Sequence, residues 1–266
     1  MSKLESSFLD IGRLDRLAAA DTGVHRLDPR AKLLTTFVFL LCVVSFGKYE
    51  VAALLPFLVF PVALVAVGDL PVGYLLGKLL VVAPFAVLVG AANPFFDPDP
   101  LVRLGPVTLS GGWVSYASIL ARFVLTVSAA LVLIATTSFH GVCVGLQRLG
   151  LPEVMVVQLL LLYRYLFVLT DEGLRLVRAR ALRSFGRRGT GLRVYGSLVG
   201  HLLLRTLDRA RRIHRAMLAR GFHGLFHSTS TLHIGPSEVW FTLGWCSLFV
   251  FLRLVNVPQL LGSLFT

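Results

Sequence analysis

Apolar stretches alternate with short polar breaks along most of this chain. They cover residues 33–47, 51–68, 79–96, about 117–138 and 239–252, the last continuing past Arg253. The hydrocarbon core of a bilayer is about 30 Å thick and a helix rises about 1.5 Å per residue, so a spanning helix needs roughly 20 residues. The pattern therefore predicts a chain that crosses a membrane several times as helices.

Short links and prolines define how these stretches fold. The four-residue link 47–50 predicts an antiparallel helical hairpin, and Pro56 and Pro61 predict that its second helix is bent, since proline removes a backbone hydrogen bond. Residues 93–100 hold three prolines and two aspartates, which end the third helix. The following residues, to about 112, are expected to form a long loop or a short hairpin.

The composition excludes an ordinary soluble domain. Of the 266 residues, 56% are hydrophobic and only 15% are charged, against about 25% charged in a typical soluble domain. The three cysteines, Cys42, Cys143 and Cys246, have no metal-binding or redox spacing and are expected to be small core residues. Mixed charges among the first 32 residues argue against a secretory signal peptide, so the amino-terminal segment is expected to be retained.

Positive charge is concentrated in residues 171–236. This block holds 13 arginines against three acidic residues, a surplus of ten in a chain whose net charge is +12. Cytoplasmic segments are rich in Lys and Arg, so the block is expected in the cytoplasm, and four crossings before it return the amino terminus to the same side. We therefore expect an amino-terminal segment with membrane helices at 1–170, a cytoplasmic region at 171–236 and a final membrane helix at 237–266.

Residues 154–170 are apolar but are interrupted by Arg164. This stretch is short for a full crossing, so a span, a half-span and a buried helix on the cytoplasmic face all stay open. Arg164 is expected to pair with Asp171 or Glu172, one or two helical turns on, and so to support the region that follows. Arg122, in the fourth apolar stretch, is expected to extend toward the headgroups at the outer end.

The basic block has the periodicity of amphipathic helices. Apolar residues recur at spacings of three, four and seven while arginines fill the other faces, which predicts a helix from about Ser197 to Gly221. These apolar residues are Leu203, Leu207, Ala210 and Met217. A shorter helix is expected over 172–185, ended by Gly186. The fold class is therefore all-α: a polytopic membrane protein with about five or six membrane helices and two long cytoplasmic amphipathic helices.

Three kinds of partner suit two basic amphipathic helices: lipid headgroups, nucleic acid and another protein. Nucleic acid is disfavoured, because no aromatic interleaving or folded binding motif accompanies the arginines. The triplets Ala179-Arg180-Ala181 and Ala219-Arg220-Gly221, at the ends of the two helices, favour a protein partner over the lipid bilayer alone. An arginine between two small residues can enter a groove and bind a carboxylate through two guanidinium nitrogens.

The chain resembles a known transporter family. HRLDPRAKL at 25–33, ATTS at 135–138, LYRY at 162–165 and the two triplets are similar to the transmembrane T component of energy-coupling factor (ECF) transporters, and within it to the cobalt-importing branch, CbiQ. In that family the triplets end two coupling helices that dock in grooves of two ABC ATPase subunits. The resemblance implies that Arg180 and Arg220 are coupling arginines here, with Ala181 in place of the family's glycine.

The same resemblance implies a subunit that transmits energy without hydrolysing ATP. ATP and Mg would bind the partner ATPases, and this chain would carry no cofactor, catalytic residue or metal ligand. Its other partner would be a metal-specific, substrate-binding membrane subunit, and its location the bacterial inner (plasma) membrane. A nickel or vitamin importer stays open as the alternative. A stand-alone carrier is disfavoured, because the spans lack buried ionisable groups and matched broken helices.

Motifs for other activities are missing from the sequence. GxxxxGK[ST], HExxH and GxSxG are absent, so the chain is not expected to be an ATPase of the P-loop type, a metalloprotease or an α/β-hydrolase. His223, His227 and His233 follow the second triplet. The surrounding glycines, serines and threonines predict irregular structure there, and surface or packing roles rather than a metal site.

Overall fold

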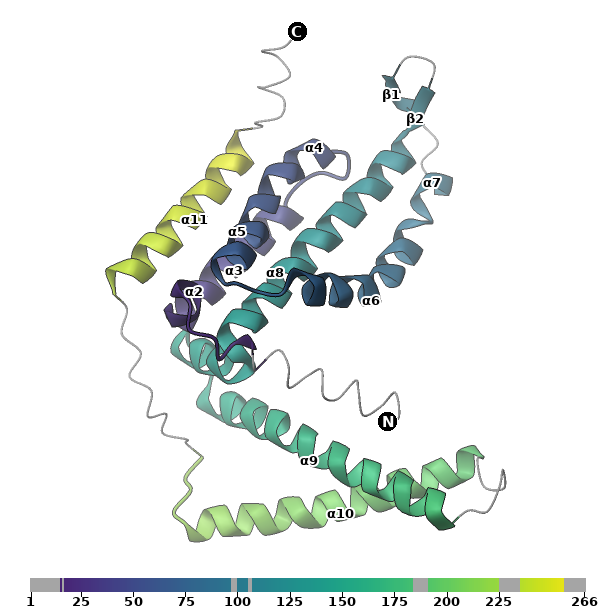
Figure 1. Cartoon of the computed structure of the whole chain (residues 1–266), viewed down its shortest axis with the longest axis vertical. Coiled ribbons are helices and arrows are strands. Elements are labelled where there is room, and N and C mark those ends of the chain that lie inside the picture. The colour runs from purple at the N-terminus through teal and green to yellow at the C-terminus, as the bar shows by residue number, and fades with distance from the viewer. Residues whose placement is uncertain are drawn as a thin grey trace. The chain divides into compact units, whose positions relative to one another are not determined.

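The computed structural model is mainly helical, with one pair of short strands (Figure 1). The described residues are 15, 17–96, 100–104, 107–183, 191–224 and 235–255. The helices are α2 (Gly23–Arg26), α3 (Pro29–Val44), α4 (Val51–Leu54), the 3₁₀ helix η1 (Leu55–Leu58), α5 (Val59–Val67), α6 (Val72–Gly90), α7 (Asn93–Phe96), α8 (Gly111–Arg148), α9 (Glu153–Arg183), α10 (Leu192–Ala219) and α11 (Pro236–Leu254). The predicted all-helical fold class is confirmed.

Four of the described helices, α6, α8, α9 and α11, are long and apolar enough to cross a membrane. Residues 51–67 form a shorter apolar segment, and α3 has 16 residues. On α6, Phe85 and Leu88 are 70% and 74% exposed, which suits a surface that faces lipid or a membrane partner rather than water. The polytopic membrane architecture predicted from the sequence is confirmed.

Prolines interrupt the hydrogen bonds of the segment 51–67. Pro56 lies in η1, a turn of tighter 3₁₀ helix between α4 and α5, and Pro61 lies in the first turn of α5. Proline has no backbone N–H to donate, so the regular helical ladder is broken here, as predicted. The third helix differs from its predicted bounds, because it begins at Val72 and includes Lys78.

A two-stranded hairpin precedes α8. Strands β1 (Pro100–Leu104) and β2 (Val107–Ser110) pair antiparallel, with Arg103 opposite Thr108 and Leu104 opposite Val107. Of the two alternatives expected for this segment, a long loop or a short hairpin, the structure has the hairpin.

Two compact units make up the described chain. One contains α2 to α7, nearly all of α8, and α11, and the other contains α9 and α10. The boundary expected at residue 170 falls inside α9, which runs unbroken from Glu153 to Arg183. This helix carries both the apolar residues 154–170 and the first arginines of the basic block. The compact units therefore divide the chain at a different place, and α11 belongs with the earlier helices instead of standing as a region of its own.

Aromatic side chains form the core of the first unit. Four buried rings meet with centroids 4.8–6.1 Å apart, distances at which aromatic pairs attract one another. They are Phe39 of α3, Phe57 of η1, Phe60 of α5 and Phe249 of α11. Phe249 joins α11 to α3, and Figure 1 shows these two helices side by side.

Two arginines cap the carboxyl end of α3. Arg122 of α8 donates to the carbonyl oxygens of Phe46 and Gly47, at 3.0 and 2.6 Å. Arg253 of α11 donates to the side-chain and carbonyl oxygens of Ser45, at 2.9 and 3.1 Å. The last carbonyls of a helix have no partners within it and carry partial negative charge, so guanidinium groups stabilise them. Arg122 is thus bound to the backbone after α3, where the sequence suggested an extension toward headgroups.

Candidate functional site

The predicted coupling region consists of α9 and α10, which cross in an antiparallel arrangement (Figure 1). Three pairs of residues mark the crossing: Glu172 with Arg205, Gly173 with Leu202, and Arg180 with Tyr195. Gly173 faces Leu202, and a Cβ at this position would lie 3.9 Å from the Leu202 side chain, an ordinary van der Waals distance. As the residue numbers of these contacts rise along α9, those of their partners on α10 fall, as expected for antiparallel helices.

Glu172 joins the two helices electrostatically. Its carboxylate accepts a hydrogen bond from Arg205 at 2.7 Å and lies 3.8 Å from the guanidinium of Arg209. Arg205 is exposed, so water screens the attraction, and the pair fixes the register of the helices more than it stabilises them.

This arrangement differs from the ion pair expected for Arg164. Among the described residues of this unit, the ion pairs link Glu172 to Arg205 and Arg209, and Arg164 takes part in none. Arg164 and Asp171 are seven residues apart on one helix, about 10 Å along its axis, which is far for a direct pair. In place of the predicted pairing with Arg164, Glu172 contacts two arginines of α10.

Beyond the crossing, the two helices leave an apolar groove of about 430 Å³ between them. Its α9 side includes Leu161, Tyr165 and Leu169, and its α10 side includes Leu207 and Met217. Of the apolar residues predicted for one face of the second amphipathic helix, Leu207, Ala210 and Met217 line this groove, while Leu203 is exposed. This confirms the amphipathic pattern read from the spacing of its apolar residues.

The triplet Ala219-Arg220-Gly221 ends α10 in a Schellman motif. Gly221 has φ +78°, a left-handed conformation that favours glycine, and its N–H donates to the carbonyl of Leu218 at 3.0 Å. The N–H of Phe222 donates to the carbonyl of Met217, also at 3.0 Å. Arg220 precedes this turn and its side chain is exposed. The helix stop predicted at Gly221 is confirmed, and the arginine lies at the tip of the helix.

The triplet Ala179-Arg180-Ala181 lies within α9, because this helix continues to Arg183. The guanidinium carbon of Arg180 is 4.8 Å from the centre of the Tyr195 ring on α10, an attractive cation–π contact. Arg180 is half-buried, while both flanking alanines are exposed. A helical backbone does not require glycine, so alanine suits this position. Gly186, the expected end of this helix, lies outside the described residues.

Sequence reasoning missed Tyr195 and Arg205. Each faces its partner, Arg180 or Glu172, across the connection between two helices, so neither pair fits the three- or four-residue spacing of a single helix. One sequence rule could have found these pairs: in two antiparallel helices, the residue numbers of facing residues add up to nearly the same sum. The rule can be applied only after one contact between the two helices is known.

The histidines and cysteines form no metal cluster in the part of the chain that the structure describes. His223 is exposed, while His227 and His233 lie outside the described residues. The three cysteines are free thiols. Within the described ranges, no group of three or more His, Cys, Asp or Glu side chains is placed to hold a metal ion.

Comparison with known proteins identifies the family. The CbiQ family, described as cobalt transport protein, matches residues 21–231, which include α9, α10 and both triplets. This chain belongs to the CbiQ family. The match also includes the segments 25–33 and 135–138, which lie in the other compact unit.

Several relatives of this CbiQ-family chain are described as transport proteins. The cobalt transport protein CbiQ of Rhodobacter capsulatus is 28% identical over 235 residues, covering 84% of this chain and 89% of the relative. The energy-coupling factor transporter transmembrane protein EcfT of Leuconostoc gelidum subsp. gasicomitatum is 25% identical over 224 residues, covering 79% and 83%. The nickel permease LarQ of Lactiplantibacillus plantarum is 28% identical over 162 residues, covering 55% and 59%.

Proposed function

We propose that this chain is the energy-coupling membrane subunit of an ATP-driven importer of the energy-coupling factor type. It hydrolyses no ATP itself. Two ABC ATPase subunits, which hold ATP and Mg, bind α9 and α10, and a substrate-binding membrane subunit packs against the apolar helices. The chain lies in the bacterial inner membrane, with its amino terminus and residues 171–236 in the cytoplasm.

The observation that carries the proposal is the exposed Arg220 at the end of α10. The Schellman motif satisfies carbonyls at this helix end, so the tip presents mainly the arginine side chain between Ala219 and Gly221. A guanidinium with such small neighbours can enter a narrow groove and bind a carboxylate through two parallel hydrogen bonds. An acidic groove on a protein partner fits this chemistry.

Transmission of movement requires a rigid connection between the two arginines. The contacts at the crossing support such a connection, because Glu172 pairs with Arg205 and the Arg180 guanidinium lies over the Tyr195 ring. When nucleotide binding and hydrolysis move the two ATPase grooves, each arginine follows its groove and the crossed helices are displaced. The displacement passes to the membrane helices and tilts the substrate-binding subunit.

Cobalt is the proposed cargo. The description of the family and the name of the Rhodobacter capsulatus relative both support it. The nickel permease of Lactiplantibacillus plantarum supports nickel as the second candidate, over a shorter part of the chain. Selection between the two metals is assigned to the substrate-binding subunit.

Charge reversal at the coupling arginines tests the proposal. Arg180→Glu, Arg220→Glu and the double variant are compared with Arg212→Glu, which makes the same change of charge at another exposed arginine of α10. We expect cobalt uptake to fall to background in Arg220→Glu and in the double variant, because a glutamate repels an acidic groove. We also expect the double variant to lose its ATPase subunits in a detergent pull-down.

Arg212→Glu is expected to retain both uptake and ATPase binding. Unchanged uptake and an unchanged pull-down in the double variant would refute the coupling role. Equal losses in Arg212→Glu and Arg220→Glu would show that the overall charge of α10 matters rather than its tip, as binding to anionic lipid would require.

A further inference from the structure

The long helix α8 is broken at Ser138. This residue has φ +58° and ψ +159°, a combination that residues other than glycine rarely adopt, and the chain is helical on both sides of it. A conformation of this kind persists only where the surrounding contacts determine it, and such strain often marks functional sites. The contacts that surround Ser138 come from the amino-terminal segment and from α3.

The helical part before the break is capped by a buried lysine. The Nζ of Lys32 on α3 donates to the carbonyl oxygen of Thr136 at 2.8 Å and to that of His25 at 3.4 Å. Lys32 is only 5% exposed, and a buried ammonium group requires partners of this kind. The carbonyl end of a helix also attracts positive charge. Lys32 therefore supplies a hydrogen-bond donor for a carbonyl group at the end of the first part of α8.

The helical part after the break is capped by oxygen atoms. The N–H of Phe139 donates to the Asp15 carboxylate at 3.0 Å, and the N–H of Gly141 donates to the Ser138 hydroxyl oxygen at 3.1 Å. The first N–H groups of a helix have no partners within it, so these two acceptors serve as an N-cap. The break thus has a cation on its carbonyl side and an anion on its N–H side.

Close packing holds the part of α8 after the break against the start of α3. Gly141 and Gly145 are one turn apart, and a Cβ on Gly145 would lie 2.6 Å from the Leu33 side chain and 3.1 Å from Pro29. Two small residues four positions apart allow helices to approach closely. The motifs 25–33 and 135–138 therefore meet at one junction.

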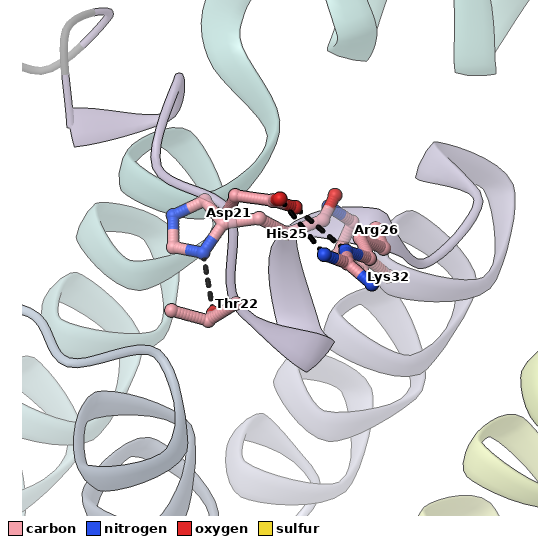
Figure 2. A network of polar contacts seen from close by, with 5 residues as sticks. All are labelled: Asp21, Thr22, His25, Arg26 and Lys32. Carbon is pink, nitrogen blue, oxygen red and sulfur yellow. Dashed lines mark hydrogen bonds and ion pairs between the residues drawn. The ribbon is translucent and has the colours of Figure 1, made fainter.

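The turn that positions Lys32 is held by polar contacts (Figure 2). His25 Nδ1 lies 2.7 Å from the Thr22 hydroxyl, and Arg26 donates two hydrogen bonds to Asp21, at 2.6 and 2.8 Å. Burial, and then the nearby charge of Lys32, lower the pKa of His25. Both effects favour the neutral imidazole beside Lys32.

We propose that Lys32 is a positioning residue for energy transmission, which keeps α8 broken at Ser138 so that the chain leaves the break in one fixed direction. This inference rests on the proposed function. The residues after the break lead through a short link into α9, the helix of the first coupling triplet. If the backbone at Ser138 could change conformation freely, a movement of α9 would bend the chain there and would not reach the helical part before the break.

The test measures cobalt uptake and ATP hydrolysis by the complete transporter in the same proteoliposomes. Lys32→Met removes the donor but keeps a long side chain, and Lys32→Arg keeps a donor. We expect Lys32→Met to lower uptake per ATP hydrolysed about ten-fold, the effect of losing a buried hydrogen bond from a charged group, and Lys32→Arg to restore most of it. Lys48→Met, at an exposed lysine after α3, is the control and is expected to leave the ratio unchanged.

Ser138→Gly is a second variant, designed to fold normally. Glycine tolerates the φ and ψ of this position, but it removes the hydroxyl cap and allows other conformations, so uptake per ATP is expected to fall while assembly is retained. An unchanged ratio in Lys32→Met, or in Ser138→Gly if Lys32→Met does not assemble, would overturn the positioning role.

The same preparations separate this proposal from the proposed function. If the wild-type chain holds no ATPase subunits, the proposed coupling function fails. If it holds them and Arg220→Glu abolishes uptake, but the uptake-to-hydrolysis ratio of the Lys32 and Ser138 variants equals that of the wild type, only the positioning role of Lys32 fails.

Discussion

The two triplets proposed for coupling have almost the same sequence but different structural settings. Ala219-Arg220-Gly221 ends α10, where a left-handed glycine turns the chain and the arginine is exposed. Ala179-Arg180-Ala181 lies within α9, where the arginine is half-buried and contacts Tyr195. In the second triplet, the left-handed backbone conformation requires glycine at position 221. In the first triplet, Ala181 lies in a regular helix, and its small side chain only leaves space around Arg180.

If both arginines bind ATPase subunits as proposed, this difference implies that they do so differently. Arg180 is held by the Tyr195 ring, so part of its side-chain freedom is already lost before binding. Arg220 has an exposed side chain and loses its freedom on binding. We expect the two contacts with the ATPases to have unequal strength and unequal sensitivity to substitution.

The largest effect expected from this comparison is that of Gly221→Val. A Cβ at Gly221 would meet no atom within 4 Å, so the penalty arises from the backbone conformation alone. A residue other than glycine in the left-handed region costs about 1–2 kcal/mol, and a β-branched side chain is worse, so we expect cobalt uptake to fall about ten-fold. Uptake is measured with equal amounts of each variant in the membrane.

Ala181→Gly is the matched change in the other triplet. Its cost is that of a glycine in a helix, about 1 kcal/mol or less, and we expect uptake to fall clearly less than in Gly221→Val. If Ala181→Gly reduced uptake as much as Gly221→Val, the two triplets would have the same structural requirement and the comparison would be wrong.

A smaller effect is expected from Tyr195→Ala. Loss of a cation–π contact at an accessible site costs about 0.5–1 kcal/mol, so the affinity of the Arg180 contact should fall about two- to five-fold. Tyr195→Phe keeps the aromatic ring and serves as the control. Binding of the purified ATPase subunits to the detergent-solubilised chain measures both variants.

The Tyr195 prediction is specific to the first triplet. Combining Tyr195→Ala with Arg180→Ala should give no further loss, because the ring then has no arginine to hold. Additive losses in the double variant would show that Tyr195 acts on α9 and α10 without acting through Arg180.

The features predicted well from the sequence are those that local rules control. The apolar stretches gave the membrane architecture, Pro56 predicted the bent segment, and Gly221 predicted the end of α10. Each depends on backbone chemistry or on residues a few positions apart. The family resemblance, which rested on short motifs and the two triplets, is likewise confirmed by the match over residues 21–231.

The features that sequence reasoning missed depend on distant contacts or on backbone continuity. The sharp change in composition near residue 171 suggested a boundary, but a helix can continue through such a change, and α9 does. Arg122 binds carbonyls that follow α3, which hydropathy cannot indicate. The break at Ser138 has no proline or glycine at its position, because Lys32 and Asp15 supply the contacts from far away in sequence.

Site-specific photo-crosslinking at position 220 tests the central claim most directly. A photoreactive residue replaces Arg220 in the assembled transporter, with the same replacement at Arg212 as the control. We predict that the adduct at position 220 contains an ATPase subunit, while the one at position 212 contains far less of it. An adduct at position 220 that contains only phospholipid, in a preparation that still holds both ATPase subunits, would contradict the account.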